Sequence, residues 1–220
     1  MTNNSPAAQT EAAEMRAASC GAGLAATQQT PEEQAYRSGA YGMLARLLRS
    51  APDRAVLDQV AGFTRVDRRQ DEMTLAMSML GLAASTSQPE AVDDEFHALF
   101  IGIGRGELVP YASWYLTGFL MERPLGRLRD DLAALGFQRQ EGVTEPEDHA
   151  AALCEVMAIL IDEGVALEQQ AHFFQSHMAD WLGRFFNDLS EAETAVFYRA
   201  IGRFGAAFVT LEQRYMNMPV

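Results

Sequence analysis

The strongest constraint on the fold of this chain is a helix-start signal that recurs along it. A Ser or Thr is followed three residues later by a Glu, the capping-box spacing, at Thr30, Ser87, Thr144 and Ser190. Large apolar residues then recur at helical spacing after these signals. We find no alternating β-branched stretch bounded by turn residues and no internal repeat. The sequence therefore predicts an all-α fold, an irregular bundle of about nine or ten helices.

The helices are expected over consecutive stretches separated by Pro, Gly and Ser. Their approximate ranges are 30–48, 56–63, 67–84, 89–100, 113–121, 124–135, 144–162, 167–174, 178–189 and 190–211. Gly136 is predicted to end one helix as a C-cap residue, and Gly164 to break another. Ser190 to Glu193 are predicted to cap the last helix.

Composition divides the chain into two regions. Residues 1–29 are mostly small and polar, too poor in large apolar groups to offset the entropy of ordering, so we expect a disordered tail. Residues 30–220 are expected to form a single all-helical domain. No apolar run approaches the roughly 20 residues of a membrane span, so we expect no stable membrane insertion. The N-terminus lacks the features of a secretory signal, and a cytoplasmic location is predicted.

The charge balance narrows the class of partner. The formal net charge is −13 at pH 7 and the sequence pI is about 4.7. Nucleic acid is excluded as an expected partner, because phosphate binding requires a basic face. A basic peptide suits an acidic surface better. The two cysteines, Cys20 and Cys154, have no metal-site spacing and are not expected to form a disulfide, which fits a reducing compartment.

One stretch, from Val109 to His149, carries unusual chemistry. A loop with Trp114 and Tyr115 is followed, after a predicted helical hairpin, by an acidic helix start that leads directly into His149. The aromatic pair either fastens the loop to the core or forms a binding surface. Asp148 and His149 either cap a helix and fill the core or belong to a functional site.

Two other patterns do not support a cofactor or a metal. Gly102, Gly104 and Gly106 follow a helix rather than a strand, and the chain has no Lys for a phosphate-binding loop. His172 and His177 are five residues apart, which places them on different faces of a helix. We therefore predict no catalytic residues, no metal site and no cofactor.

Several motifs together resemble the TorD/DmsD family of cytoplasmic chaperones for molybdenum oxidoreductases. They are E-F-x-x-L-F from Glu95 to Phe100, P-Y-x-S-W-Y from Pro110 to Tyr115, E-P-x-D-H from Glu145 to His149, H-x-x-x-W from His177 to Trp181, and F-Y at residues 197–198. The resemblance covers about residues 35–212. It implies a helical, non-enzymatic chaperone that binds the twin-arginine leader, and often the body, of an apo-enzyme, delaying export and keeping the enzyme competent for cofactor insertion.

The resemblance also places the leader-binding region at the aromatic loop and the Asp-His pair. Carboxylates accept hydrogen bonds from guanidinium groups bidentately, so we add the neighbouring glutamates, Glu145 and Glu147, to the predicted leader-binding region. The predicted peptide-binding residues are Pro110, Ser113, Trp114, Tyr115, Glu145, Glu147, Asp148 and His149. The expected partner is an apo-molybdoenzyme catalytic subunit or its twin-arginine leader, bound by a monomer or homodimer. The alternatives are a metal- or nucleotide-dependent helical enzyme using Asp148 and His149, and a helical scaffold without leader recognition.

Overall fold

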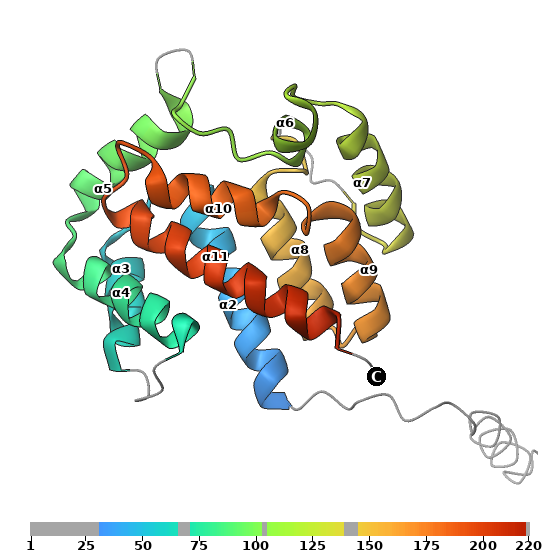
Figure 1. Cartoon of the computed structure of the whole chain (residues 1–220), viewed down its shortest axis with the longest axis horizontal. Helices are drawn as coiled ribbons and strands as arrows, with labels where there is room; N and C mark the ends of the chain where they lie inside the picture. Colours follow the sequence, from blue (N-terminus) through green and yellow to red (C-terminus); the bar gives the residue numbers. More distant parts are fainter. Residues whose placement is uncertain (1–30, 66–70, 103–104, 139–144, 219–220) are drawn as a thin grey trace, which may run out of the picture. The chain divides into compact units, whose positions relative to one another are not determined.

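Helices make up almost all of the regular structure in the computed structural model, which describes residues 31–65, 71–102, 105–138 and 145–218 (Figure 1). These residues contain ten α-helices and no strand, which confirms the predicted all-α bundle. The predicted tail, residues 1–29, lies outside the described residues. Within them, no helix has the length and apolar character needed to cross a bilayer.

The first five helices range in length from 6 to 19 residues. They are α2 Pro31–Arg49, α3 Arg54–Ala61, α4 Glu72–Thr86, α5 Pro89–Phe96 and α6 Ala112–Thr117. Aspartates cap two of them, because Asp53 accepts from the Val56 N–H and Asp71 from the Thr74 N–H. A 3₁₀ turn, Gly62–Arg65, extends α3, and a π turn, His97–Ile101, extends α5. These helices agree with the predicted ranges, although α6 stops four residues early at Gly118, which is left-handed.

The remaining helices form the second half of the unit. They are α7 Arg123–Ala134, α8 Ala150–Asp162, α9 Leu167–His177, α10 Leu182–Glu191 and α11 Phe197–Met216. Gly136 and Gly164 follow α7 and α8 with φ of 86° and 68°, the left-handed region that glycine adopts readily. The predicted helix ends at these two glycines are therefore confirmed.

The predicted start of α8 at Thr144 is wrong, since the helix begins at Ala150 and Thr144 lies outside the described residues. The preceding segment is instead paired with the loop before α6. The Ala150 N–H donates to the Pro110 carbonyl at 2.8 Å, and the Ala112 N–H donates to the Asp148 carbonyl at 3.0 Å. These long-range bonds hold the segment outside the helix.

The capping boxes predicted at Ser87 and Ser190 are also wrong in detail, and Thr30, the first residue of the remaining box, lies outside the described residues. Ser190 lies inside α10, where its hydroxyl donates to the Asn187 carbonyl. Ser87 likewise donates back to the Ala83 carbonyl, and Gln88 begins α5 without a side-chain cap. In both places the serine hydroxyl bonds to the preceding helix, so it does not accept from the next one.

A carboxylate from a distant helix caps α11 in place of the predicted local signal. The Glu95 side chain, on α5, accepts the backbone N–H groups of Val196, Phe197 and Tyr198 at 2.7 to 3.0 Å. A negative charge at this end of a helix is favoured by the helix dipole and satisfies N–H groups that have no intrahelical partner. The glutamate of the E-F-x-x-L-F motif thus joins α5 to α11.

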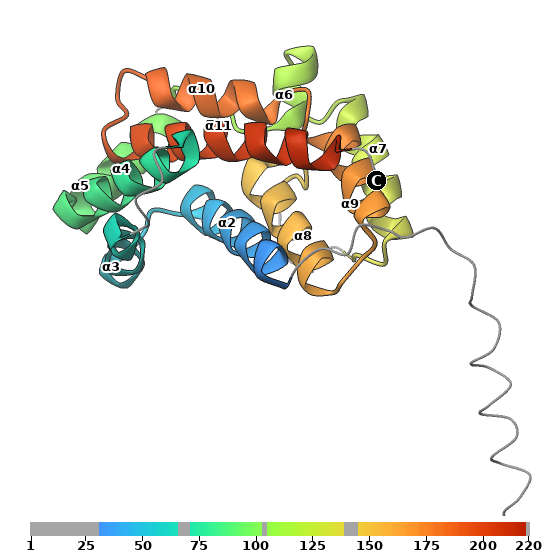
Figure 2. The ribbon, with the colours of Figure 1, turned by 60° about the horizontal axis from the view of Figure 1, so that its bottom comes forward.

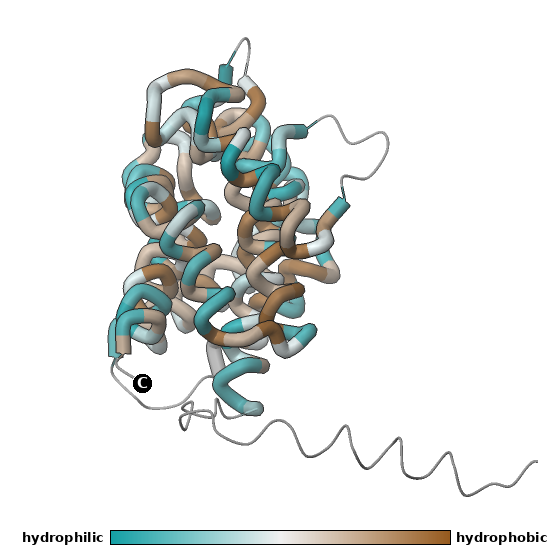
Figure 3. Tube along the Cα trace, turned by 90° about the vertical axis from the view of Figure 1, so that its right-hand side faces the viewer, coloured by the Kyte–Doolittle hydropathy of each residue, from teal (hydrophilic) through white to brown (hydrophobic). Residues whose placement is uncertain are grey.

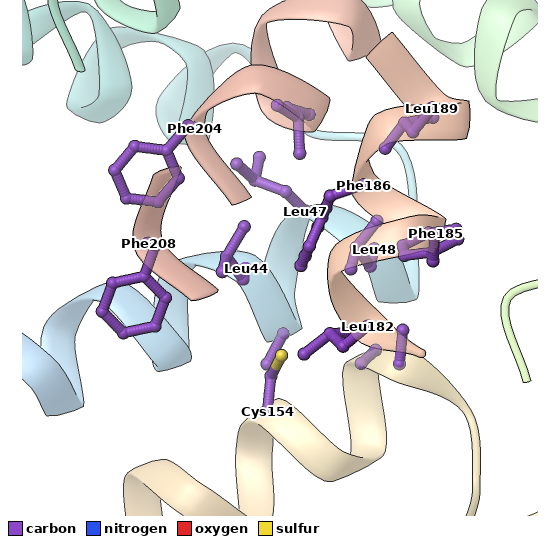
Figure 4. Close-up of a cluster of buried hydrophobic side chains, with 14 of the residues drawn as sticks. Leu44, Leu47, Leu48, Cys154, Leu182, Phe185, Phe186, Leu189, Phe204 and Phe208 are labelled. Carbon is purple, nitrogen blue, oxygen red and sulfur yellow. The ribbon is translucent and has the colours of Figure 1, made fainter. Parts of the chain in front are cut away.

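The core lies where α2, α8, α10 and α11 meet (Figure 2). Its close-up shows leucines of α2 facing aromatic residues of α10 and α11, with Cys154 of α8 beneath them (Figure 4). Cys154 is fully buried, and burial raises the pKa of its thiol to about 12. Figure 3 shows hydrophobic and hydrophilic residues alternating along the helices, as expected for helices buried on one face.

The helices α10 and α11 approach each other closely at two glycines. A Cβ atom at Gly202 would lie 2.5 Å from the Ser190 nitrogen, and one at Gly205 would lie 2.3 Å from the Phe186 ring. No side chain fits at Gly202 without displacing the α10 backbone, or at Gly205 without moving the Phe186 ring.

A buried polar network ties α11 to α2 and α9. Arg37 donates to both oxygens of Glu212, at 2.8 and 2.9 Å, and to the Gln170 amide oxygen at 2.9 Å. The Tyr41 hydroxyl adds a bond to Glu212 at 3.0 Å. Bidentate geometry and further hydrogen bonds are the conditions under which a buried ion pair is tolerated.

Candidate functional site

The two motifs of the predicted site come together in the folded chain. Tyr111 and His149 form an isolated antiparallel bridge, flanked by the two backbone bonds that join Pro110 to Ala150 and Ala112 to Asp148. The aromatic loop before α6 and the acidic segment before α8 are therefore one local structure. All eight predicted residues lie on these two segments, although Thr144 and the residues just before it are outside the described chain.

The Asp148 side chain caps the start of α6, not the start of α8. Its side chain is buried, and Oδ2 accepts both the backbone N–H of Ser113, at 2.8 Å, and the Ser113 hydroxyl. Its carboxylate thus caps the first turn of α6 from another segment. The second oxygen, Oδ1, is buried without a hydrogen-bond partner among the described residues. An unsatisfied buried carboxylate oxygen calls for an explanation, because it costs free energy.

His149 begins α8 as its N-cap residue. The Nδ1 atom accepts the Ala151 N–H at 3.0 Å, so Nδ1 is unprotonated in this arrangement. The ring meets the Tyr111 ring edge to face at 5.0 Å, and Nε2 lies 3.7 Å from Glu145. Burial lowers the pKa of His149, although the Glu145 charge opposes the shift. The sequence left two interpretations open for His149, a capping and core-packing residue or a functional one. Its contacts in the fold are those of a capping and core-packing residue.

The accessible part of the predicted site consists of Trp114, Tyr115, Glu145 and Glu147, all half-buried. Three of them already contact arginines of the same chain. The guanidinium of Arg105 lies 4.9 Å from the Trp114 ring centre, that of Arg184 lies 5.8 Å from the Tyr115 ring centre, and Arg129 bonds to Glu147 at 2.8 Å. These arginines were not predicted as part of the site, because each comes from a different part of the chain.

Tyr115 fastens its helix to α10, the first of the two roles left open for it. Its hydroxyl donates to Asp188 at 2.8 Å, and its ring lies 5.5 Å from that of Trp181. Burial, together with the Asp188 bond, raises the pKa of Tyr115 well above its ordinary value. Pro110 and Ser113 are buried, so they position their neighbours rather than present a surface.

Beside this structure lie two adjoining cavities among α6, α7 and α9. The smaller, about 20 Å³, is lined by Leu116, Arg127, Asp148 and His177 among others. The larger, about 380 Å³, shares Arg127 and His177 and adds two aspartates of α7. A third cavity of about 420 Å³ lies elsewhere, between α2, α3 and α4, and is lined mainly by apolar groups such as Met43, Phe63 and Met77. Among the described residues, no group of three or more potential ligands is arranged to hold a metal ion.

Comparison with known proteins identifies the family. A family model described as the nitrate reductase delta subunit matches residues 67–187, more than half of the chain. The chaperone protein TorD of Vibrio cholerae serotype O1 (strain M66-2) is 27% identical over 176 residues, which cover 75% of this chain and 73% of the relative. TorD of Shewanella loihica (strain ATCC BAA-1088 / PV-4) is 27% identical over 205 residues, covering 84% and 94%. This chain belongs to the TorD family.

The fold of this TorD-family chain is shared with a solved structure. A crystal structure assigned to a redox enzyme maturation protein from Archaeoglobus fulgidus superposes with a TM-score of 0.56 over 86% of this chain and 99% of the other, at 16% identity. This likeness shows the shared fold, and the family model confirms the family resemblance inferred from the motifs. The TorD-family protein is a maturation chaperone for molybdoenzymes, as that resemblance implied, and not an enzyme.

Proposed function

We propose that this TorD-family chaperone binds the twin-arginine leader, and the apo form, of a molybdenum-containing oxidoreductase in the cytoplasm. Binding delays export of the client and keeps it ready for cofactor insertion. The leader contacts the half-buried residues Trp114, Tyr115, Glu145 and Glu147 and one carboxylate oxygen of Asp148, while the buried residues Pro110, Ser113 and His149 position them. The chaperone acts as a monomer or homodimer.

One observation carries this proposal. Arginines of the chain itself lie over Trp114 and Tyr115 and on Glu147, so these side chains are already arranged to meet guanidinium groups. Stacking on an aromatic face and pairing with a carboxylate are the two favoured contacts of arginine. Leader arginines offer the same chemistry and exchange with the arginines of the chaperone. An acidic chain also attracts a basic leader.

Replacing Asp148 by Asn tests the role of charge in the site. Asparagine keeps the shape and accepts from Ser113, but it removes the negative charge. Affinity for a twin-arginine leader peptide should fall by about 1.5–3 kcal/mol, the range for hydrogen bonds to charged groups. At about 1.4 kcal/mol per tenfold, that is one to two decades in Kd. Calorimetry with the peptide measures the change, and circular dichroism confirms that the variant is folded.

Asp94→Asn is the matched control, because it removes one negative charge at an exposed position on α5. It should leave peptide affinity within about threefold of the wild type, less than one decade. Equal peptide affinities for Asp148→Asn and wild type would exclude Asp148 from recognition. A pull-down from the native host tests the client itself, which should be a molybdopterin-type catalytic subunit.

A further inference from the structure

We infer that the adjoining cavities among α6, α7 and α9 form a pocket for one cationic side chain of a bound peptide, with Asp148 at its inner end and Asp131 on its wall. This inference rests on the proposed function and adds a subsite to it. Figure 1 shows α7 beside both α6 and α9, the arrangement that forms the pocket. Neither α7 nor α9 contributes to the peptide-binding residues predicted from the sequence.

The inner end of the pocket offers an acceptor. Asp148 Oδ1 is buried and unpartnered among the described residues, and Asp148 lines the cavity of about 20 Å³. That volume fits one water-sized atom, such as a water oxygen or the terminal nitrogen of a long side chain. The opposite oxygen, Oδ2, already accepts from Ser113, so the carboxylate is held in place.

The outer part of the pocket adds further negative charge. The cavity of about 380 Å³ shares Arg127, Ser176 and His177 with the smaller one and is also lined by Asp130 and Asp131. The Asp131 carboxylate is 41% exposed and bonds through Oδ2 to His177 Nε2 at 2.7 Å. It retains lone pairs for a second donor.

The shape and charge of the pocket favour a guanidinium group over other ligands. A guanidinium carries several donors on a planar fork, so one nitrogen reaches the inner carboxylate while others meet the outer one. Arg127 lines both cavities and is exposed, so its own guanidinium competes with the ligand for the aspartates of the pocket. The three aspartates outnumber it, so the net charge of the lining favours a cation while His177 is neutral.

An exposed apolar strip beside the pocket indicates what accompanies the cation. The strip runs from the last turn of α6 to the start of α7 and comprises residues with exposures of 39% to 73%, namely Leu116, Phe119, Leu120 and Met121. It is continuous with the pocket because Leu116 lines the smaller cavity. Exposed apolar groups gathered at a charged cavity fit a peptide in which apolar residues adjoin the cationic one.

The first test uses a small probe on the full chain. N-acetyl-arginine methylamide should produce saturable NMR shifts at the Ser176 amide and the His177 ring, and the neutral citrulline analogue should produce none. Asp131→Asn should weaken the arginine shifts, while Asp94→Asn, an equal charge change at an exposed site on α5, should leave them unchanged. Equal shifts from the two probes, or no saturable shift with arginine, would overturn the inference.

The second test changes the leader arginine and Asp131 separately and together. In calorimetry with a twin-arginine leader peptide, replacing the arginine that enters the pocket by citrulline should weaken binding to wild type about ten- to a hundredfold. Asp131→Asn should weaken binding of the original peptide but not of the citrulline peptide, because the two changes remove one interaction. Independent, additive effects would contradict the pocket. The peptide exchange uses the unaltered chain, so it does not depend on the variant folding.

A variant of the strip separates the apolar contact from the cationic one. Phe119→Ser should weaken binding of the leader peptide and leave binding of the arginine probe unchanged. The proposed function and the pocket can also be refuted independently of each other. A leader that does not bind, together with a probe that does, would refute the proposed function and keep the pocket. A leader that binds equally well to wild type and Asp131→Asn would refute the pocket alone.

Discussion

At the scale of single residues, His149 links the start of α8 to pH. Its Nδ1 accepts the Ala151 N–H only while the ring is neutral, and burial lowers its pKa in the folded state. Between that lowered pKa and the unfolded value of about 6.5, the unfolded chain binds more protons than the folded one. The free energy of unfolding should therefore fall as pH drops through about 6.5 and level off below the folded pKa.

The variant His149→Asn isolates this effect. Asparagine is a good N-cap residue and does not titrate, so the helix start is kept. Denaturant unfolding from about pH 7.5 to about pH 5 should give a smaller loss of stability for the variant than for wild type. A residual slope is expected from His177, whose pKa burial also lowers. Identical slopes for the two proteins would show that protonation of His149 does not break the cap.

At the scale of elements, the start of α11 depends on Glu95 of α5. Three backbone N–H groups donate to this carboxylate, and no local side chain caps the helix. Glu95→Ala should therefore lower the free energy of unfolding by about 1.5–3 kcal/mol, the range for hydrogen bonds to a charged group. The neighbouring Asp94 is exposed, and Asp94→Ala should stay within about 0.5 kcal/mol of wild type. Chemical denaturation of both variants measures the difference.

The same helix shows what local sequence predicts and what it does not. The periodicity of residues such as Ile201, Phe204 and Phe208 predicted α11, because a helix's own spacing decides which face is buried. Its cap was mispredicted, because a serine and a glutamate at the right spacing do not reveal that a carboxylate 101 residues earlier takes the Val196 N–H. Helix ends depend on tertiary partners wherever such a partner outcompetes the local signal.

At the scale of the whole molecule, the candidate site was predicted as a set of residues but not as an arrangement. The motifs place an aromatic loop and an acidic segment far apart in sequence, and the family resemblance put them in one region. Their pairing through Tyr111 and His149, the use of Asp148 by α6, and the arginine on Glu147 all require the fold. The pocket wall of α7 and α9 was missed because Asp131 and His177 meet across 46 positions of sequence.

The net charge of −13 leads to a prediction for the whole chain. Charge of one sign attracts an oppositely charged ligand before contact, so it acts mainly on the association rate. Raising ionic strength from about 0.01 M to about 0.15 M shortens the Debye length from about 30 Å to about 8 Å. The association rate constant of a twin-arginine leader peptide should therefore fall about tenfold or more over this range, within the span known for steered encounters.

The dissociation rate separates steering from direct pairing. Asp148 is buried and Glu147 half-buried, so salt should screen pairing at these carboxylates less than it screens the long-range field. Stopped-flow measurements should show a dissociation rate that changes much less than the association rate. A leader peptide with citrulline at both arginines should lose most of the salt dependence of association. A salt-independent association rate for the original peptide would show that the acidic surface does not attract the leader, even if the bound complex uses carboxylates.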